Sequence, residues 1–144
     1  MISLQQARAL HLAAQGLLAP PAKTATRAAL RATIQRMALL QIDTIHVVAR
    51  SPYLVLFSRL GHYPRAWLED TLASGQIFET WAHEACFAPA DDLLQHRSYN
   101  RSARSHWGLA HAQKTHAAQR THLDALLAHI RDNGPVKSSD FVRT

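Results

Sequence analysis

The β-branched run from Gln41 to Val48 most constrains the fold, because it interrupts a chain whose other segments mostly follow helical spacing. The run contains no Gly or Pro and follows a basic amphipathic segment, so it predicts a strand. Side chains alternate between the two faces of a strand, which places Gln41 and Asp43 on one face and points Ile42 into the core. An amide and a carboxylate so arranged are suited to orient one water molecule between them.

Capping residues and apolar spacing predict short helices around this strand, with Ser3, Thr26 and Ser51 as N-caps. The predicted helices cover residues 3–18, 26–39, 53–60, 64–74, 93–99 and 112–131. Residues 76–89 predict two further strands joined by a bend at residues 81–84. The expected fold is therefore mainly α with a small antiparallel β-sheet, in the element order of a winged helix-turn-helix.

The C-terminal third predicts the beginning of another domain. Gly134 and Pro135 end the long helix, and Ser138 to Phe141 resembles a helix start that lies three residues before the end of the sequence. We expect a winged-helix domain carrying the Gln-x-Asp motif over residues 1–110. We expect residues 111–144 to be the start of a second, truncated winged-helix unit.

Charge and composition favour an anionic partner. The 144-residue chain has a formal net charge of +6, and residues 1–42 and 93–123 hold Lys and Arg but neither Asp nor Glu. Nucleic acid and an anionic membrane surface both fit this charge, although solvated basic helices are the simpler alternative. A single Cys, no apolar span and no signal-peptide pattern predict a soluble protein of the reducing cytoplasm.

Three segments supply candidate DNA contacts. Arg50 lies beside a predicted helix start, where backbone N–H groups favour phosphate, and Trp81 and His83 lie at the predicted strand bend. Each residue also has a simpler interpretation, as a helix-cap neighbour, a core aromatic or a solvated charge. The main candidate DNA contacts are Arg27, Arg31, Arg50, Ser51, Tyr53, Trp81 and His83, and Arg97, Arg101 and Arg104 are further candidates for contacts with the DNA backbone.

Other site chemistries find little support in the sequence. His83-Glu84 lacks the second His of a His-Glu-x-x-His motif, and no Gly-rich phosphate loop occurs. Cys86 lies among apolar residues, as an inert core thiol would. We therefore expect no metal site and no cofactor.

Several motifs in order resemble a bacterial family of winged-helix DNA glycosylases, the AlkZ/YcaQ-like enzymes that excise alkylated bases and unhook interstrand crosslinks. The matching segments are residues 8–18, 39–61, 63–64, 67–68, 81–87 and 134–141, including Leu39-Leu40-Gln41-Ile42-Asp43-Thr44-Ile45 and Trp81-Ala82-His83-Glu84-Ala85-Cys86-Phe87. The match is weaker at about residues 95–125. Gln41-Ile42-Asp43 resembles the Gln-x-Asp branch of the family rather than the Gln-x-Gln branch.

The resemblance implies a monofunctional glycosylase that hydrolyses the N-glycosidic bond of alkylated or crosslinked purines in double-stranded DNA. Gln41 and Asp43 would be its catalytic residues, and the protein would act as a monomer without a cofactor. The sequence leaves two alternatives open: a non-catalytic winged-helix DNA-binding module such as a regulator, and an inactive truncated remnant. The Gln-x-Asp strand separates the first alternative from an enzyme, because a regulator does not need to orient water.

Overall fold

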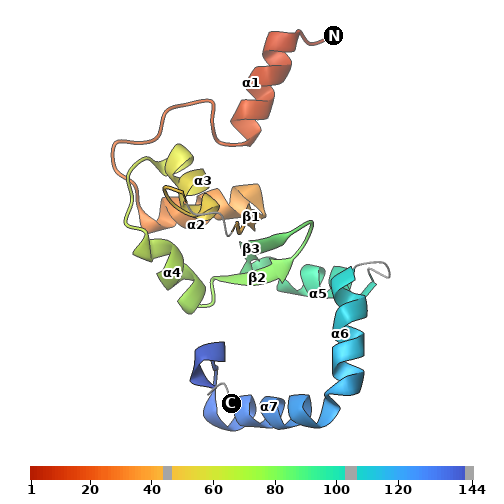
Figure 1. The fold of residues 1–144 in the computed structure, drawn as a ribbon. Helices are drawn as coiled ribbons and strands as arrows, with labels where there is room; N and C mark the ends of the chain where they lie inside the picture. The colour runs from red at the N-terminus through yellow and green to blue at the C-terminus, as the bar shows by residue number, and fades with distance from the viewer. Residues whose placement is uncertain (44–46, 103–106, 142–144) are drawn as a thin grey trace. The chain divides into compact units, whose positions relative to one another are not determined.

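A computed structural model describes residues 1–43, 47–102 and 107–141, and the chain forms two compact units, Met1–Ser102 and Ala103–Thr144 (Figure 1). The first unit contains α1 (Leu4–Ala14), α2 (Arg27–Met37), β1 (Leu40–Gln41), α3 (Ser51–Leu60), α4 (Ala66–Ala73), β2 (Ile77–Trp81), β3 (Ala85–Pro89), η1 (Ala90–Asp92) and α5 (Leu93–Ser102). The second contains α6 (Trp107–Ala118), α7 (Arg120–Asn133) and η2 (Ser138–Asp140). The fold is mainly α with one small antiparallel sheet, as the sequence predicts for a winged helix. That residues 111–144 begin a second winged-helix unit stays a prediction.

The sheet has the strand order β1-β3-β2, and both pairs of neighbours are antiparallel. Leu40 lies opposite Phe87, and Gln41 lies opposite Cys86, which in turn lies opposite Thr80. Since residues directly opposite each other share a face, Gln41 and Thr80 belong to one face and Leu40 to the other. The two faces contact different helices, and this division positions the candidate site.

The core lies on the Leu40 face of the sheet, where α2, α3 and α4 contribute apolar side chains. Its buried members are Leu30, Ile34, Leu40, Leu56, Leu60, Tyr63, Leu68 and Ile77. Leu30 and Leu56 are 0% exposed, and burying each such side chain stabilises the fold by about 1.5–3 kcal/mol. Helical spacing predicts a buried stripe of Leu30, Ile34 and Met37 on α2, extending to Ala38; Leu30 and Ile34 are buried and Met37 is half-buried, whereas Ala38 is exposed.

Local capping explains where several helices begin. The Ser3 side chain accepts a hydrogen bond from the Gln6 backbone N–H, and the Gln6 side chain accepts one from the Ser3 N–H, which forms a capping box for α1. The Thr26 hydroxyl accepts a hydrogen bond from the Ala29 N–H at 3.1 Å, so Thr26 caps α2 as predicted.

Two predicted helix boundaries are wrong. The first helix ends at Ala14 rather than near Leu18, because Gly16 takes a φ of +70° that turns the chain out of the helix. The N-cap of α3 is Arg50 rather than Ser51, so that Ser51 is the first helical residue. The Ser51 hydroxyl is consequently directed elsewhere and donates a hydrogen bond to the Gln41 carbonyl at 3.2 Å.

The long helix predicted over residues 112–131 is also wrong, because α6 and α7 are separate helices. They meet at Gln119, whose φ of −122° and ψ of 25° lie outside the helical region. The Gln119 amide oxygen pairs with the His122 ring nitrogen at 2.9 Å. Among the residues of α7, none is buried, so little packing opposes the break.

Candidate active site

The Gln-x-Asp motif lies at the edge of the sheet, where the β1 ladder ends. The strand predicted over residues 41–48 is wrong in extent: β1 comprises Leu40–Gln41, and one further ladder-type hydrogen bond runs from the Ile42 N–H to the Ala85 carbonyl at 2.8 Å. Residues 44–46 lie outside the described part of the chain. The ladder ends because β3 begins at Ala85, so the chain beyond Ile42 meets no further β3 residue.

Gln41 contacts the hairpin bend directly. Its side chain is exposed, and its Oε1 lies 3.2 Å from Nε2 of His83, which belongs to the bend between β2 and β3. An amide oxygen only accepts hydrogen bonds, so His83 donates from Nε2 in this arrangement. The amide NH₂ of Gln41 is then the end of the side chain that can donate to a water molecule.

Asp43 follows Gln41 by two residues and is half-buried at the end of the ladder. The backbone around it is anchored twice, by the Ile42 hydrogen bond to β3 and by the Ser51 hydroxyl on the Gln41 carbonyl. These bonds tie the motif to the hairpin and to the first turn of α3. The motif therefore sits on structured elements, which hold catalytic groups more rigidly than a free loop does.

The strand register places Trp81 and His83, the two candidate DNA contacts at the bend, differently. Gln41, Cys86 and Thr80 form one row across the sheet, and neighbouring Trp81 therefore belongs to the opposite face. Trp81 is half-buried there. The structure thus brings His83 to Gln41 but directs Trp81 to the other side of the sheet.

The second face of the sheet is covered in part by α5. The Phe78 and His96 rings meet edge to face with centroids 5.7 Å apart, and the Asn100 amide donates to the Thr80 hydroxyl at 3.4 Å. Gln41 shares this face with Phe78 and Thr80. The candidate site is therefore flanked by the bend and by α5, a helix that the sequence predicts without linking it to the motif.

The candidates at the start of α3 lie close to the motif in the fold. Arg50 is exposed at the N-cap, and Ser51 holds the Gln41 carbonyl. The Tyr53 hydroxyl donates to the Glu69 carboxylate, and this hydrogen bond is the main cause of a raised Tyr53 pKa. Arg50 and Ser51 thus adjoin the Gln41 backbone, whereas Tyr53 is engaged with α4.

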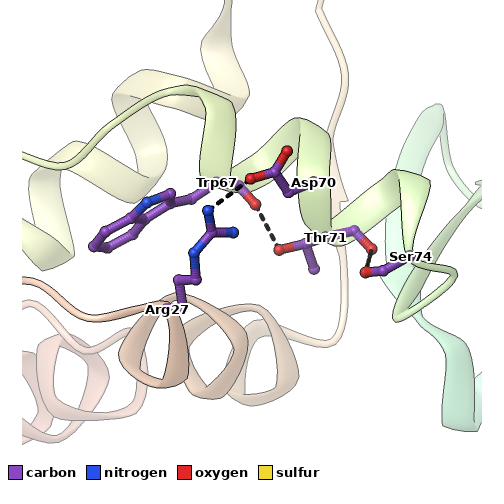
Figure 2. Close-up of polar contacts among 5 residues, drawn as sticks. All are labelled: Arg27, Trp67, Asp70, Thr71 and Ser74. Atoms are coloured by element: carbon purple, nitrogen blue, oxygen red, sulfur yellow. Dashed lines mark hydrogen bonds and ion pairs between the residues drawn. The ribbon is translucent and has the colours of Figure 1, made fainter.

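The two candidate arginines of α2 have partners within the protein. Figure 2 shows the Arg27 guanidinium between Trp67 and Asp70. Its Nη2 lies 2.7 Å from Oδ2 of Asp70, and its central carbon lies 5.4 Å from the centroid of the Trp67 ring. Arg31 donates to the Gln76 amide oxygen at 2.8 Å. These partners belong to α4 and to the turn that follows it, away from the bend that carries His83.

Thr71 is a buried polar residue of α4 and is satisfied locally. Its hydroxyl donates to the Trp67 carbonyl at 2.6 Å, and its own carbonyl accepts from the Ser74 hydroxyl at 3.1 Å (Figure 2). A buried polar group with a hydrogen-bond partner stabilises the fold and does not by itself indicate a site. We assign Thr71 a structural role in α4.

Cys86 lies opposite Gln41 in the ladder, and its thiol is unreactive. It is 0% exposed, and burial raises the pKa of its thiol, so little thiolate forms near neutral pH. Over residues 1–43, 47–102 and 107–141, no group of three His, Cys, Asp or Glu side chains could hold a metal ion. Within the same ranges, no helix is long and apolar enough to cross a membrane.

Fold and site together define a winged-helix domain with a polar pair at the edge of its sheet. The model of the family described as DNA glycosylase AlkZ-like matches residues 34–144, which is more than half of the 144-residue chain. The chain belongs to this family of DNA repair glycosylases, which are hydrolases that act on DNA. No solved structure matches the chain.

Sequence reasoning missed two features of the site. It predicted His83 as a DNA contact but not as the hydrogen-bond partner of Gln41, since the two are 42 positions apart. It also missed Gln95 and Tyr99 of α5, which line the same hollow as His83. The available signal for these two was their spacing of four residues on a helix, which places them on one helical face.

Proposed function

We propose that this chain hydrolyses the N-glycosidic bond of an alkylated or interstrand-crosslinked purine in duplex DNA. The main support is that the Gln-x-Asp motif lies at an exposed sheet edge, where His83 is hydrogen-bonded to the Gln41 amide oxygen. That bond orients the amide so that its NH₂ end is available to hold water. Membership of a DNA glycosylase family supports the reaction type.

The leaving group explains why so few catalytic groups suffice. An N7-alkylated purine already carries a positive charge, which weakens its glycosidic bond and removes the need for a strong general acid. The remaining tasks are to place water at the anomeric carbon and to stabilise the oxocarbenium-like sugar. In our proposal Asp43 accepts a proton from the water and its negative charge stabilises the sugar, while Gln41 holds the water oxygen.

The proposed products are a free alkylated base and an abasic site. Water supplies the hydroxyl that bonds to the anomeric carbon, and the electrons of the glycosidic bond leave with the base and neutralise its charge. The water proton passes to Asp43 and then to solvent. No cofactor takes part in this balance.

Phosphate contacts would hold the duplex at this edge. Arg50 is the strongest candidate in our proposal, because it is exposed beside the N-terminus of α3 and adjoins Ser51, which bonds to the motif. Trp81 and Tyr53 stay proposals as DNA contacts. Arg27 and Arg31 would have to exchange their internal partners for phosphate, which lowers their expected contribution.

The test is single-turnover excision from a duplex holding one N7-methylguanine, with the protein in saturating excess. We expect Asp43→Asn to lower the rate by about 10²–10⁴-fold, the range for loss of a general base. Glu79→Gln is a matched control, since Glu79 is an exposed carboxylate on the opposite face of the same sheet. Duplex binding by the wild type without excision would instead favour a non-catalytic DNA-binding module, and absence of both would favour an inactive remnant.

A further inference from the structure

A hollow of 260 Å³ lies between the hairpin bend and α5, next to the candidate active site. Ala82 and His83 of the bend line one side, and Gln95, His96 and Tyr99 of α5 line the other. Its volume is just below the range of about 300–1,000 Å³ typical of small-molecule pockets. It therefore has room for one planar ring system.

The wall formed by α5 is held in place by contacts with the sheet. His96 packs edge to face against Phe78, and Asn100 is bonded to Thr80. Gln95 and Tyr99 lie four residues apart and so share a neighbouring face of the same helix. Tyr99 is 62% exposed, so much of this large aromatic residue remains accessible to a ligand.

The hollow and the catalytic motif share His83. Nε2 of this residue lies 3.2 Å from the Gln41 amide oxygen, while its side chain also lines the hollow. A base seated against His83 would thus lie next to the Gln41 amide, two residues before Asp43 in the chain. This adjacency is what a glycosidic bond requires, since the bond joins the base to the attacked carbon.

From these contacts we propose that the hollow holds the cationic alkylated purine, with the base stacked on Tyr99 and Gln95 bonding to its polar edge. A flat cation over a tyrosine face gains both stacking and cation–π attraction. An undamaged neutral purine gains less, so the hollow favours alkylated bases. This inference rests on the proposed function and adds the residues that select the substrate.

The experiment measures the dissociation constant for a duplex with one non-cleavable N7-methylguanine, carrying a 2′-fluoro sugar, and for the same duplex undamaged. The proteins are the full chain and its variants Tyr99→Ala, Tyr99→Phe and Phe57→Ala. Phe57 is a matched control, because it is an exposed aromatic of α3, 55% accessible, that does not line the hollow. Because Tyr99 is exposed, we expect Tyr99→Ala to fold like the wild type, and thermal unfolding of each variant checks this.

We expect Tyr99→Ala to weaken binding of the damaged duplex by about 5- to 140-fold, which corresponds to 1–3 kcal/mol for one stacked base. Binding of the undamaged duplex should stay unchanged, and Tyr99→Phe and Phe57→Ala should behave like the wild type. Equal losses on both duplexes, no loss, or a wild type that does not prefer the damaged duplex would each overturn the proposal. Should Tyr99→Ala be less stable, Gln95→Ala takes its place, with a selective loss on the damaged duplex again expected.

Duplex binding and base excision report separately on the hollow and on the glycosylase reaction. Selective binding that depends on Tyr99, without excision by the wild type, would support the hollow as a base site and refute the glycosylase reaction. Excision by the wild type with unchanged selectivity in Tyr99→Ala would support the reaction and refute the hollow.

Discussion

Replacement of His83 tests the central geometric argument, because His83 is proposed to act only through Gln41 in the chemical step. The change His83→Ala removes the hydrogen bond to the Gln41 amide oxygen, whose 3.2 Å length is at the long end of the range of about 2.7–3.2 Å for such bonds. A net hydrogen bond contributes about 0.5–1.5 kcal/mol, which corresponds to a rate loss of about 2- to 12-fold. We expect this loss in the single-turnover rate at saturating protein, well below the loss from Asp43→Asn.

A double-mutant cycle distinguishes positioning from direct participation. If His83 acts by orienting the Gln41 amide, His83→Ala should cause no further loss of rate in a Gln41→Ala background. Saturating protein removes any contribution of His83 to binding, so the assay reports the chemical step alone. Additive losses in the cycle, or a loss from His83→Ala as large as that from Asp43→Asn, would refute the reasoning.

Two further predictions concern the scaffold. Leu56→Ala removes a fully buried side chain and should lower the free energy of unfolding by about 2–5 kcal/mol in urea titrations. Leu94→Ala, at a 75% exposed position, should change this free energy by less than about 0.5 kcal/mol. Equal effects of the two substitutions would contradict the assignment of Leu56 to the core. Burial raises the pKa of Tyr63 from 10.0 to about 12, so the unfolded chain releases this proton first and stability should fall as pH rises from 10 to 12. Tyr63→Phe should show a shallower fall in chemical denaturation over that pH range, and an identical pH profile would contradict the assignment.

The arginines of α2 show why charge pattern alone is a weak guide to a nucleic-acid surface. Arg27 belongs to a cation-only stretch of sequence, yet Asp70 from a distant helix neutralises it. Both side chains are more than half exposed, at 55% and 53%, so this pair contributes only about 0.2–1 kcal/mol. The ion pair of Arg27 with Asp70 therefore stabilises the fold only weakly, so exchanging Asp70 for a DNA phosphate would cost little free energy.

Local features of the sequence predicted the elements that depend on neighbouring residues. The caps at Ser3 and Thr26, the buried stripe of α2 and the hairpin of β2 and β3 are all confirmed, because capping and periodicity act over a few positions. The helix end at Ala14 and the break at Gln119 differ from the prediction, since each depends on a single backbone conformation that apolar spacing does not encode. The strand predicted after Gln41 is too long for a different reason, because the length of a strand depends on how far its partner strand extends.

The family, the mainly α class and the residue types of the Gln-x-Asp motif all follow from the sequence alone. Three features depend on how the chain folds: β1 ends where the partner hairpin bends, His83 reaches Gln41 across 42 positions, and Trp81 faces the opposite side of the sheet. The physical reason is that side-chain identity and helical periodicity are local properties, whereas the register of an antiparallel ladder is a contact between distant segments. That register brings the bend, α5 and the Gln-x-Asp motif to one edge.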